Sequence, residues 1–283
     1  MTIAVFGATG QLGRHVLESL RSRGVAASDV RAIGRSAQRL AELEEQGFET
    51  ARADFDDPAA VRAAVEGADT VVLISASEPG KRLAQHGAVI DAAKDAGVGR
   101  IIYTSLLGVP ASDHTFAEEH RATEELIAAS GIPATLVRNG WYTENHVADF
   151  AAARERGVIA NAAGEGRTAS APRADYAEAI AVVATEDGHE GAAYELSGDT
   201  PWSFADFAAA ASRVLGREVT YRPLTQQEEA QMLEGVGLDA GTAAFVAQLS
   251  ADTARGLLAA TPGDLSRLIG RPTVPLEDTL RTW

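Results

Sequence analysis

The chain has 283 residues, a formal net charge of −15, a hydrophobic content of 46% and no cysteine. The missing cysteines exclude disulfide bonds, thiolate catalysis and cysteine-based zinc sites, and so acidic a chain is a poor nucleic-acid binder. No window approaches about 18 uninterrupted apolar residues and no secretory signal pattern opens the chain, so we expect no membrane span and a cytoplasmic location. The length suits one large α/β domain, alone or with a small lobe.

The first stretch, TIAVFGATGQLGR from Thr2 to Arg14, has the pattern of a buried strand, a glycine-rich turn and the start of a helix. Gly7, Gly10 and Gly13 let the strand turn sharply, let backbone approach a pyrophosphate and let the helix pack closely on the sheet. The N–H groups at the helix N-terminus then face the anion. A plain tight turn is the alternative, but the preceding strand and following amphipathic helix favour a dinucleotide-binding turn.

Strands and helices alternate through the first half of the chain. We expect strands at 30–33, 48–52, 70–74, 100–104 and 134–138, and helices at 38–46, 58–66, 81–96 and 116–130. This rhythm predicts an α/β fold, a Rossmann-type doubly wound parallel sheet with helices on both faces.

Helices dominate after about residue 140. They are expected at 173–185, 203–214, 225–233 and 240–260, with sparse strands at 158–160, 193–196 and 219–222. We therefore divide the chain into a dinucleotide-binding Rossmann domain, residues 1–140, and a smaller, mostly helical lobe, residues 141–283. This lobe should cap the substrate cleft and return in part to the sheet.

The second strand ends at Gly34-Arg35-Ser36, without the acidic residue that usually holds a free ribose 2′-hydroxyl. Arg35 instead suits a 2′-phosphate through charge-assisted, fork-shaped hydrogen bonding, which favours NADP over NAD. Arg39, one helical turn further on, can add a second cation. A solvated surface arginine is the alternative for both.

Further candidates follow the carboxyl ends of strands three and four, where open α/β sheets bind ligands. Asp54 and Phe55 can receive the edge and face of an adenine, although a carboxylate before Pro58 can also cap a helix. Ser75, Ala76 and Ser77 leave room for a ribose, with ordinary turn composition as the alternative.

The ends of strands five and six should flank the nicotinamide. Thr104 ends the fifth strand, and Asn139, after the sixth, can bond the carboxamide. Trp141 and Tyr142 can wall a flat substrate, or they can simply pack in a core, as aromatic residues most often do.

With GATGQLG, YTSLLG, RNGWYTEN and YELSGD in place, the chain resembles an atypical, extended-type short-chain dehydrogenase/reductase of the NmrA-like branch. It is similar to the bacterial NADPH-dependent quinone oxidoreductases of the flavin-free, zinc-independent type 2, and nearly as similar to triphenylmethane dye reductases. The resemblance covers essentially the whole chain and implies NADPH in the cleft beneath a small lobe. The cofactor contacts that it implies are Gly7, Thr9, Gly10, Gln11, Leu12, Arg35, Asn139, Gly140, Trp141, Tyr142 and Glu144.

The chain departs from the superfamily at its Tyr-x-x-x-Lys pair, where Phe116 and His120 stand. Phenylalanine cannot donate a proton, so alcohol–ketone interconversion by that route is not expected. A quinone needs less help, because hydride addition gives a stabilised phenolate that solvent, His120 or Tyr142 can protonate. For His120 a structural role is the alternative, since the sequence assigns it no acidic partner.

We therefore expect an NADPH-dependent oxidoreductase that transfers hydride to a quinone or a similar flat electrophile. A non-catalytic NADP(H)-sensing protein and a dye or enone reductase are the alternatives. The six histidines show no ligand spacing with carboxylate support, so we expect no metal. No nucleic-acid or membrane partner is expected, and both a monomer and a homodimer remain open.

Overall fold

The structure, a computed structural model, describes residues 1–76, 78 and 80–283. Contacts divide it into two units. Unit 1 comprises Met1–Ala111, Phe116–Asn139 and Arg173–Glu195, and unit 2 comprises Ser112–Thr115, Gly140–Pro172 and Leu196–Trp283. Unit 1 thus includes a stretch beyond residue 140, and the division of roles between 1–140 and 141–283 stays a prediction.

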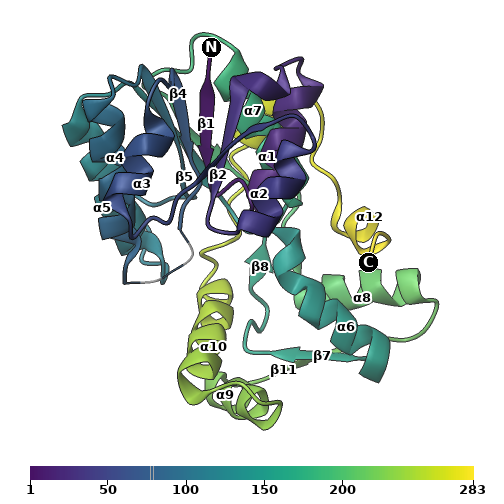
Figure 1. The fold of residues 1–283 in the computed structure, drawn as a ribbon. Helices are drawn as coiled ribbons and strands as arrows, with labels where there is room; N and C mark the ends of the chain where they lie inside the picture. The colour runs from purple at the N-terminus through teal and green to yellow at the C-terminus, as the bar shows by residue number, and fades with distance from the viewer. Residues whose placement is uncertain (77, 79) are drawn as a thin grey trace. The chain divides into compact units, whose positions relative to one another are not determined.

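A seven-stranded sheet forms the centre of unit 1, in the order β3-β2-β1-β4-β5-β6-β9. Its strands are β1 (Ile3–Phe6), β2 (Val30–Gly34), β3 (Glu49–Arg52), β4 (Thr70–Leu73), β5 (Arg100–Leu106), β6 (Ala134–Asn139) and β9 (Ala193–Leu196). Neighbours from β3 to β6 pair in parallel. Because the strand order reverses at β1, the sheet has the switch point of a doubly wound fold, which confirms the predicted Rossmann-type architecture (Figure 1).

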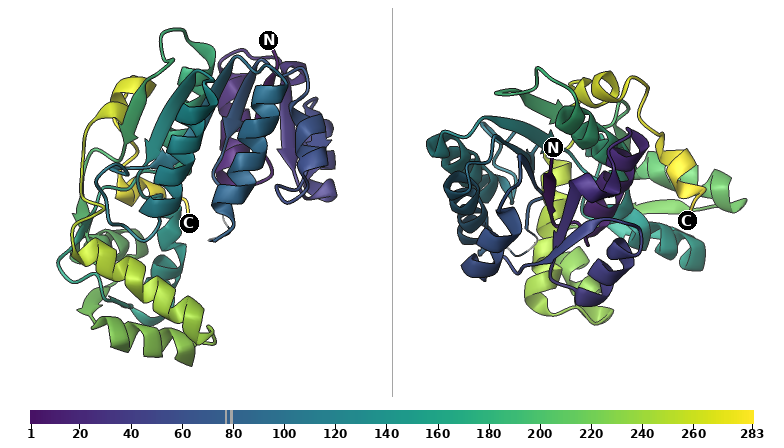
Figure 2. Two further views of the ribbon diagram at one scale, coloured as in Figure 1. Left: turned by 90° about the vertical axis from the view of Figure 1, so that its left-hand side faces the viewer. Right: turned by 45° about the horizontal axis from the view of Figure 1, so that its top comes forward.

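Helices cover both faces of this sheet (Figure 2). One face carries α1 (Gln11–Ser22), α2 (Ala37–Glu44) and α7 (Arg173–Thr185), and the other carries α3 (Pro58–Val65), α4 (Arg82–Asp95) and α5 (Ala117–Ser130). Because both faces are covered, β1, β4 and β5 are buried along their whole length. This explains the apolar runs at Ile3–Phe6, 71–73 and 101–103 within these strands.

Unit 2 is mostly helical, as predicted. It contains α6 (Val147–Arg156), α8 (Phe204–Leu215), α9 (Gln226–Gly235), α10 (Ala240–Ala254), α11 (Asp264–Ile269) and α12 (Leu276–Leu280). Two small sheets pair β7 (Val158–Asn161) with β11 (Thr220–Pro223), and β8 (Arg167–Thr168) with β10 (Trp202–Ser203). The aromatic rings of Trp202, Phe204 and Phe207 pack together in its core.

Two helix predictions need correction. The helix predicted over 240–260 ends at Ala254, because Gly256 follows in the left-handed region with a φ of +81°. Helix α6 was not predicted, although Gly157 in the left-handed conformation marks its end. The short helices α11 and α12 and the two-residue strands β8 and β10 were also not predicted. The strands and helices that were predicted otherwise agree with the structure within a few residues.

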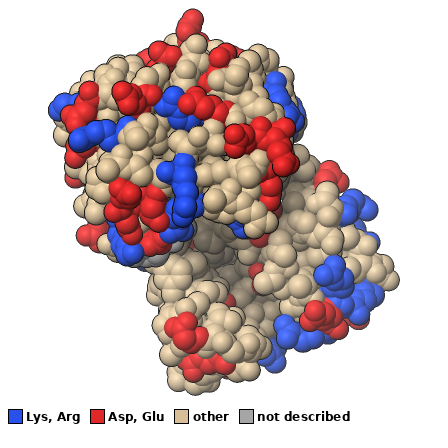
Figure 3. Space-filling model, in the orientation of Figure 1, with Lys and Arg blue, Asp and Glu red and all other residues tan. Residues whose placement is uncertain are grey.

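Charged side chains of both signs are interspersed over the face shown in Figure 3. Within the part of the chain that the structure describes, no helix is both long and apolar enough to cross a bilayer.

Gly13 determines how closely α1 approaches the turn after β1. A Cβ atom at Gly13 would lie 2.2 Å from the carbonyl oxygen of Gly7 and 2.7 Å from the Cα of Ala8. Gly7 itself has a φ of +79°, a conformation that other residues adopt only with strain. Backbone therefore occupies the space that a side chain would need at the first turn of α1.

We expect Gly13→Ala to lower the free energy of unfolding by about 1–3 kcal/mol, the usual cost of overpacking, as measured by urea denaturation. Gly87→Ala is the matched control, because Gly87 also lies inside a helix, α4, and its Cβ would meet Leu126 Cδ1 at an ordinary 3.8 Å. That control should be neutral or stabilising by up to about 1 kcal/mol. Equal destabilisation by both variants would contradict this account of the turn.

Candidate functional site

The N-terminus of α1 is built to receive an anion. Gly10 is its N-cap, and no described side chain caps the helix there or adds an acidic group in its first turn. Gly10 N–H donates to Gly7 O at 2.9 Å, which closes the turn. The first backbone N–H groups of α1 therefore lie together at the positive end of the helix dipole.

The predicted residues of this turn differ in burial. Thr9 lies against Gly34, where an added Cβ would come within 2.5 Å of Thr9 Oγ1. Leu12 is buried at 6% exposure, whereas Gln11 is exposed at the start of α1. The close packing of Thr9 on Gly34 brings the turn and the end of β2 together.

Three arginines surround the carboxyl end of β2. Arg35 Nη1 lies 2.8 Å from Glu78 Oε1, Arg39 Nη1 donates to Thr9 O at 3.2 Å, and Arg52 Nε donates to Arg35 O at 3.2 Å. Sequence reasoning named Arg35 and Arg39 and missed Arg52. Arg52 is the last residue of β3 and the register partner of Gly34, a neighbour that only the strand register reveals.

The segment after β3 combines a carboxylate turn with an aromatic ring. Asp54 Oδ1 accepts a hydrogen bond from Asp56 N–H at 3.1 Å, and Asp57 caps α3. The ring of Phe55 stacks on Phe6, with centroids 5.8 Å apart. Capping by Asp57 leaves Asp54 available for the predicted adenine contact, which stays a prediction.

Buried side chains hold the backbone that follows β4. Ser75 N–H donates to Thr104 Oγ1 at 2.8 Å, and Ala76 N–H donates to His86 Nε2 at 2.9 Å. Arg82 Nε in turn donates to Ala76 O at 2.9 Å. The third predicted residue of this segment, Ser77, lies outside the described residues.

His86 is a neutral, fully buried histidine. Because its Nε2 accepts the Ala76 N–H, its ring proton belongs on Nδ1, which lies 3.0 Å from Thr123 Oγ1. Burial is the main cause that lowers the pKa of His86 from 6.5 to about 3, and the nearby Arg82 cation adds to it. His86 therefore serves as a fixed hydrogen-bonding group near neutral pH and does not exchange protons there.

His120 and His86 both pack against the ring of Tyr103, with centroid distances of 5.9 and 5.3 Å. His120 Nδ1 is 2.7 Å from the hydroxyl of Tyr103, and His120 and Tyr103 are buried, at 6% and 0% exposure. Burial also raises the pKa of the Tyr103 phenol, which therefore stays protonated. Phe116, in place of the superfamily tyrosine, lies under the Arg82 guanidinium at 5.6 Å. The catalytic role of His120 stays a prediction.

A partly buried ion-pair network fixes the ends of β5 and β6. Arg138 pairs with both oxygens of Glu124, at 2.9 and 2.7 Å, and with Glu195 at 2.8 Å. Hydrogen bonding to Glu124 is the main cause that raises the pKa of Arg138. Ser105 Oγ donates to Glu124 at 2.5 Å, and Gly108 N–H donates to Glu195 at 2.7 Å. Sequence reasoning missed this network, whose members come from separate elements.

The predicted nicotinamide and substrate residues lie at and after the end of β6. Asn139 is buried, and its carbonyl accepts from Leu107 N–H at 3.0 Å. In unit 2, Tyr142 bridges to Ala171, and the ring of Trp141 lies 6.1 Å from that of His114. Gly140, Trp141, Tyr142 and Glu144 are all partly exposed, which leaves surface for a ligand.

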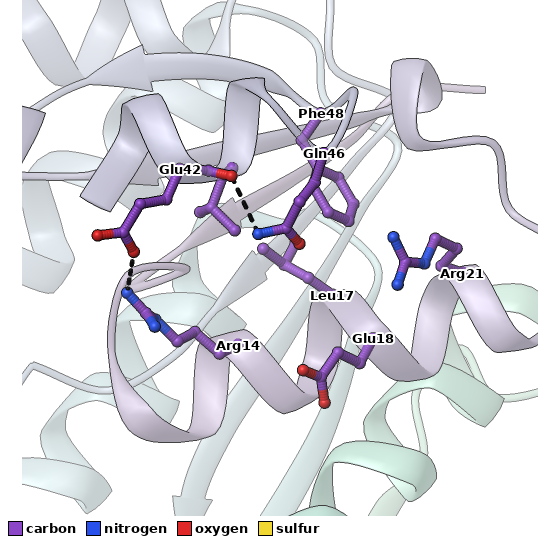
Figure 4. A pocket seen from close by; sticks show the side chains of 8 residues that line it. Arg14, Leu17, Glu18, Arg21, Glu42, Gln46 and Phe48 are labelled. Atoms are coloured by element: carbon purple, nitrogen blue, oxygen red, sulfur yellow. Dashed lines mark hydrogen bonds and ion pairs between the residues drawn. The ribbon is translucent and has the colours of Figure 1, made fainter. Parts of the chain in front are cut away.

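A pocket lies between α1 and α2 of unit 1 (Figure 4). Its lining consists of Arg14, Leu17, Glu18, Arg21, Glu42, Leu43, Gln46 and Phe48. Arg14 pairs with Glu42 at 2.9 Å, so the charges of these two residues are matched. None of the predicted site residues lines it. Among the described residues, no cluster of three His, Asp or Glu side chains could hold a metal ion.

These features are those of a dinucleotide-binding Rossmann site, and the chain belongs to the NAD(P)H-binding family, whose model matches residues 7–187. Quinone oxidoreductase 2 of Escherichia coli is 46% identical over 98% of this chain and 97% of its own length. The crystal structure of the NADPH-dependent quinone oxidoreductase of E. coli in complex with NADPH matches with a TM-score of 0.95 over 99% of both chains.

Relatives with other acceptors match over similar lengths. Triphenylmethane reductase of Citrobacter sp., solved with NADP(H), is 35% identical, with a TM-score of 0.95 over 99% of both chains. The NAD(P)H azoreductase of Xenophilus azovorans is 30% identical over 95% of this chain and 93% of its own length. These matches confirm the resemblance drawn from the sequence motifs.

The buried His86 predicts a specific pH dependence of stability. With a pKa near 6.5 when unfolded and about 3 when folded, this histidine binds more protons in the unfolded state between those values. Its contribution is therefore complete above about pH 6.5 and is lost as the pH falls, by about 2 kcal/mol at pH 5.

His86→Gln and His86→Leu both remove the titrating ring. In urea denaturation, each should shrink the difference in unfolding free energy between pH 7 and pH 5 by about 2 kcal/mol, whatever its stability at pH 7. An unchanged difference in both variants would show that His86 is not held neutral.

Proposed function

We propose that this protein is an NADPH-dependent oxidoreductase that transfers hydride to a quinone or a similar flat electrophile. The observation that carries the proposal is the 46% identity to E. coli quinone oxidoreductase 2 over 98% of this chain. The geometry of unit 1 supports it, because the fold provides a glycine turn that suits a phosphate, a cationic strand end, and side chains that hold Ser75 and Ala76 at the carboxyl edge of the sheet.

The residues of unit 1 fit the phosphates of such a cofactor. The uncapped N-terminus of α1 and the close backbone at Gly10, where a Cβ would lie 3.1 Å from Gly7 O, suit a pyrophosphate. Arg35 suits the 2′-phosphate, with Arg39 and Arg52 adding positive charge beside it. The chain as a whole, with a net charge of −15, repels anions. The local positive charge of these arginines opposes that repulsion and favours the binding of an anionic ligand here.

The remaining predicted contacts complete the proposal. Asp54 and Phe55 would hold the adenine, Ser75 to Ser77 the ribose, and Thr104 and Asn139 the nicotinamide. When bound, NADPH supplies a hydride from its nicotinamide ring. Gly140, Trp141 and Glu144 would contact the cofactor, and Trp141 and Tyr142 would position a flat acceptor by stacking.

Proton transfer is the lesser task in this reaction. Ser105 is committed to Glu124, and the phenol of Tyr103 is kept protonated by burial and paired with His120. We propose the partly exposed Tyr142 hydroxyl as the first proton donor and His120 as the second. A reduced quinone is a stabilised phenolate, so a modest donor or water suffices.

The first test is NADPH oxidation by the purified protein with and without a simple benzoquinone. The reaction is measured as the decrease in NADPH absorbance. Quinone-dependent turnover supports the reductase. NADPH binding without turnover would favour a dinucleotide sensor instead. A triphenylmethane dye is the second acceptor to try, because the 35% identity to triphenylmethane reductase favours dye reduction as the second candidate.

Cofactor selectivity should depend on Arg35. We expect Arg35→Ala to weaken NADPH binding about tenfold to a hundredfold, the worth of a charge-assisted phosphate contact, and to change NADH binding little. Titration calorimetry with both nucleotides measures this. The observed Arg35–Glu78 ion pair sets the effect toward the lower end, because the phosphate must compete with that carboxylate.

Arg62→Ala is the matched control for Arg35→Ala. Arg62 is also an exposed arginine of unit 1 paired with a carboxylate, Asp95, at 3.0 Å, and it should leave both affinities unchanged. If Arg35→Ala weakened NADPH and NADH equally, its assignment to the 2′-phosphate would be wrong.

A further inference from the structure

Both polar groups of one backbone residue, Ala76, are held by buried side chains of a single helix. His86 Nε2 accepts the Ala76 N–H at 2.9 Å, and Arg82 Nε donates to the Ala76 carbonyl at 2.9 Å. Both side chains come from α4, which begins soon after the segment that they hold. They are almost fully buried, at 0% and 5% exposure, so water does not compete for these bonds.

A second layer on α5 fixes both holding side chains. Thr123 Oγ1 faces His86 Nδ1 at 3.0 Å and donates its own proton to Glu119 O at 2.9 Å, so it receives the ring proton of His86. The Glu119 carboxylate binds Arg82 Nη1 at 2.7 Å and Gly80 N–H at 2.8 Å. The tautomer of His86 and the direction of Arg82 are therefore set before any ligand arrives.

This arrangement changes what the segment offers to a ligand. The N–H groups of Ser75 and Ala76 are already bound by Thr104 and His86, so they cannot serve as phosphate donors. Ser75 and Ala76 can still contact a ribose through their side chains and through the backbone carbonyl of Ser75. These contacts require that the backbone of both residues is held in one conformation.

We propose that His86 and Arg82 are positioning residues for the dinucleotide: by holding the N–H and C=O of Ala76, they keep Ser75 and Ala76 in the backbone conformation that receives the cofactor ribose. The inference rests on the proposed function, and it adds two residues that touch no reacting atom. Each loss of a holding bond should weaken cofactor binding while the hydride step at saturating cofactor is preserved.

The experiment compares three variants in the full chain. His86→Gln keeps an acceptor near the position of Nε2, His86→Leu fills the space without one, and Thr123→Val removes the group that fixes the His86 tautomer. Amide hydrogen exchange at Ala76 is measured in the protein without nucleotide, and the Kd for NADPH is measured by calorimetry. The kcat with benzoquinone is measured at saturating NADPH.

We expect slow exchange at Ala76 in the wild type and in His86→Gln. In His86→Leu, exchange and the Kd for NADPH should each rise about tenfold, as for the loss of one buried hydrogen bond, with kcat changed less than about threefold. Thr123→Val should lie between them. If His86→Leu fails to fold, Thr123→Val against His86→Gln gives the same comparison.

Two results would overturn the inference alone. One is continued protection of the Ala76 N–H in both His86→Leu and Thr123→Val, and the other is fast exchange with an unchanged Kd for NADPH. A wild-type protein that binds no NADPH would overturn the proposed function, and this inference with it. Rescue by His86→Gln separates positioning from general destabilisation, because all substitutions at this site disturb packing but only one keeps the acceptor.

Discussion

The approach of backbone to backbone at the start of α1 is the constraint on which unit 1 depends. Gly13 brings α1 onto the turn so closely that even a methyl group would overlap Gly7 and Ala8. That closeness places the uncapped helix end beside the carboxyl edge of the sheet, next to the arginines at the end of β2. An anion site therefore arises from main-chain geometry, with side chains adding selectivity.

Hydrogen bonding to backbone also organises the rest of this edge. Thr104, His86 and Arg82 hold the segment after β4, while Glu195 holds the turn after β5 through Gly108. Thr104, His86 and Arg82 are buried and Glu195 is partly buried, and each leaves few alternatives for the backbone that it binds. The backbone of Ser75, Ala76 and Gly108 is thus held in place before a ligand binds, so binding loses little conformational entropy at these residues.

The features that could be predicted from sequence are local. The glycine turn after β1, the position of Arg35 directly after β2 and the alternation of strands and helices depend on near neighbours in the chain, so spacing and composition predict them. The Ala76–His86 bond, Arg52 beside Arg35, and the Glu124–Arg138 pair unite elements far apart in the chain or across the sheet. No local pattern encodes such meetings, which depend on strand register and helix packing.

The same distinction explains the errors in the helical half. The alanine-rich stretch from 240 continued past its true end because alanine favours helix at every position, and only the left-handed Gly256 ends it. Helix α6 has weak apolar periodicity, and it forms because Phe150 and Ala153 pack in the core of unit 2. Helix propensity alone therefore predicts neither the end of α10 nor the presence of α6.

The absence of a tyrosine–lysine pair is compatible with the reaction that we propose. Phe116 stands where the acid would be, under the Arg82 guanidinium, and Arg82 is occupied in binding Ala76 and Glu119. Arg82, like His86, thus holds the backbone of Ala76. Because a quinone-like acceptor stabilises its own negative charge, the protein does not need to supply a strong acid. Buried side chains such as Arg82 and His86 can then hold backbone in place instead.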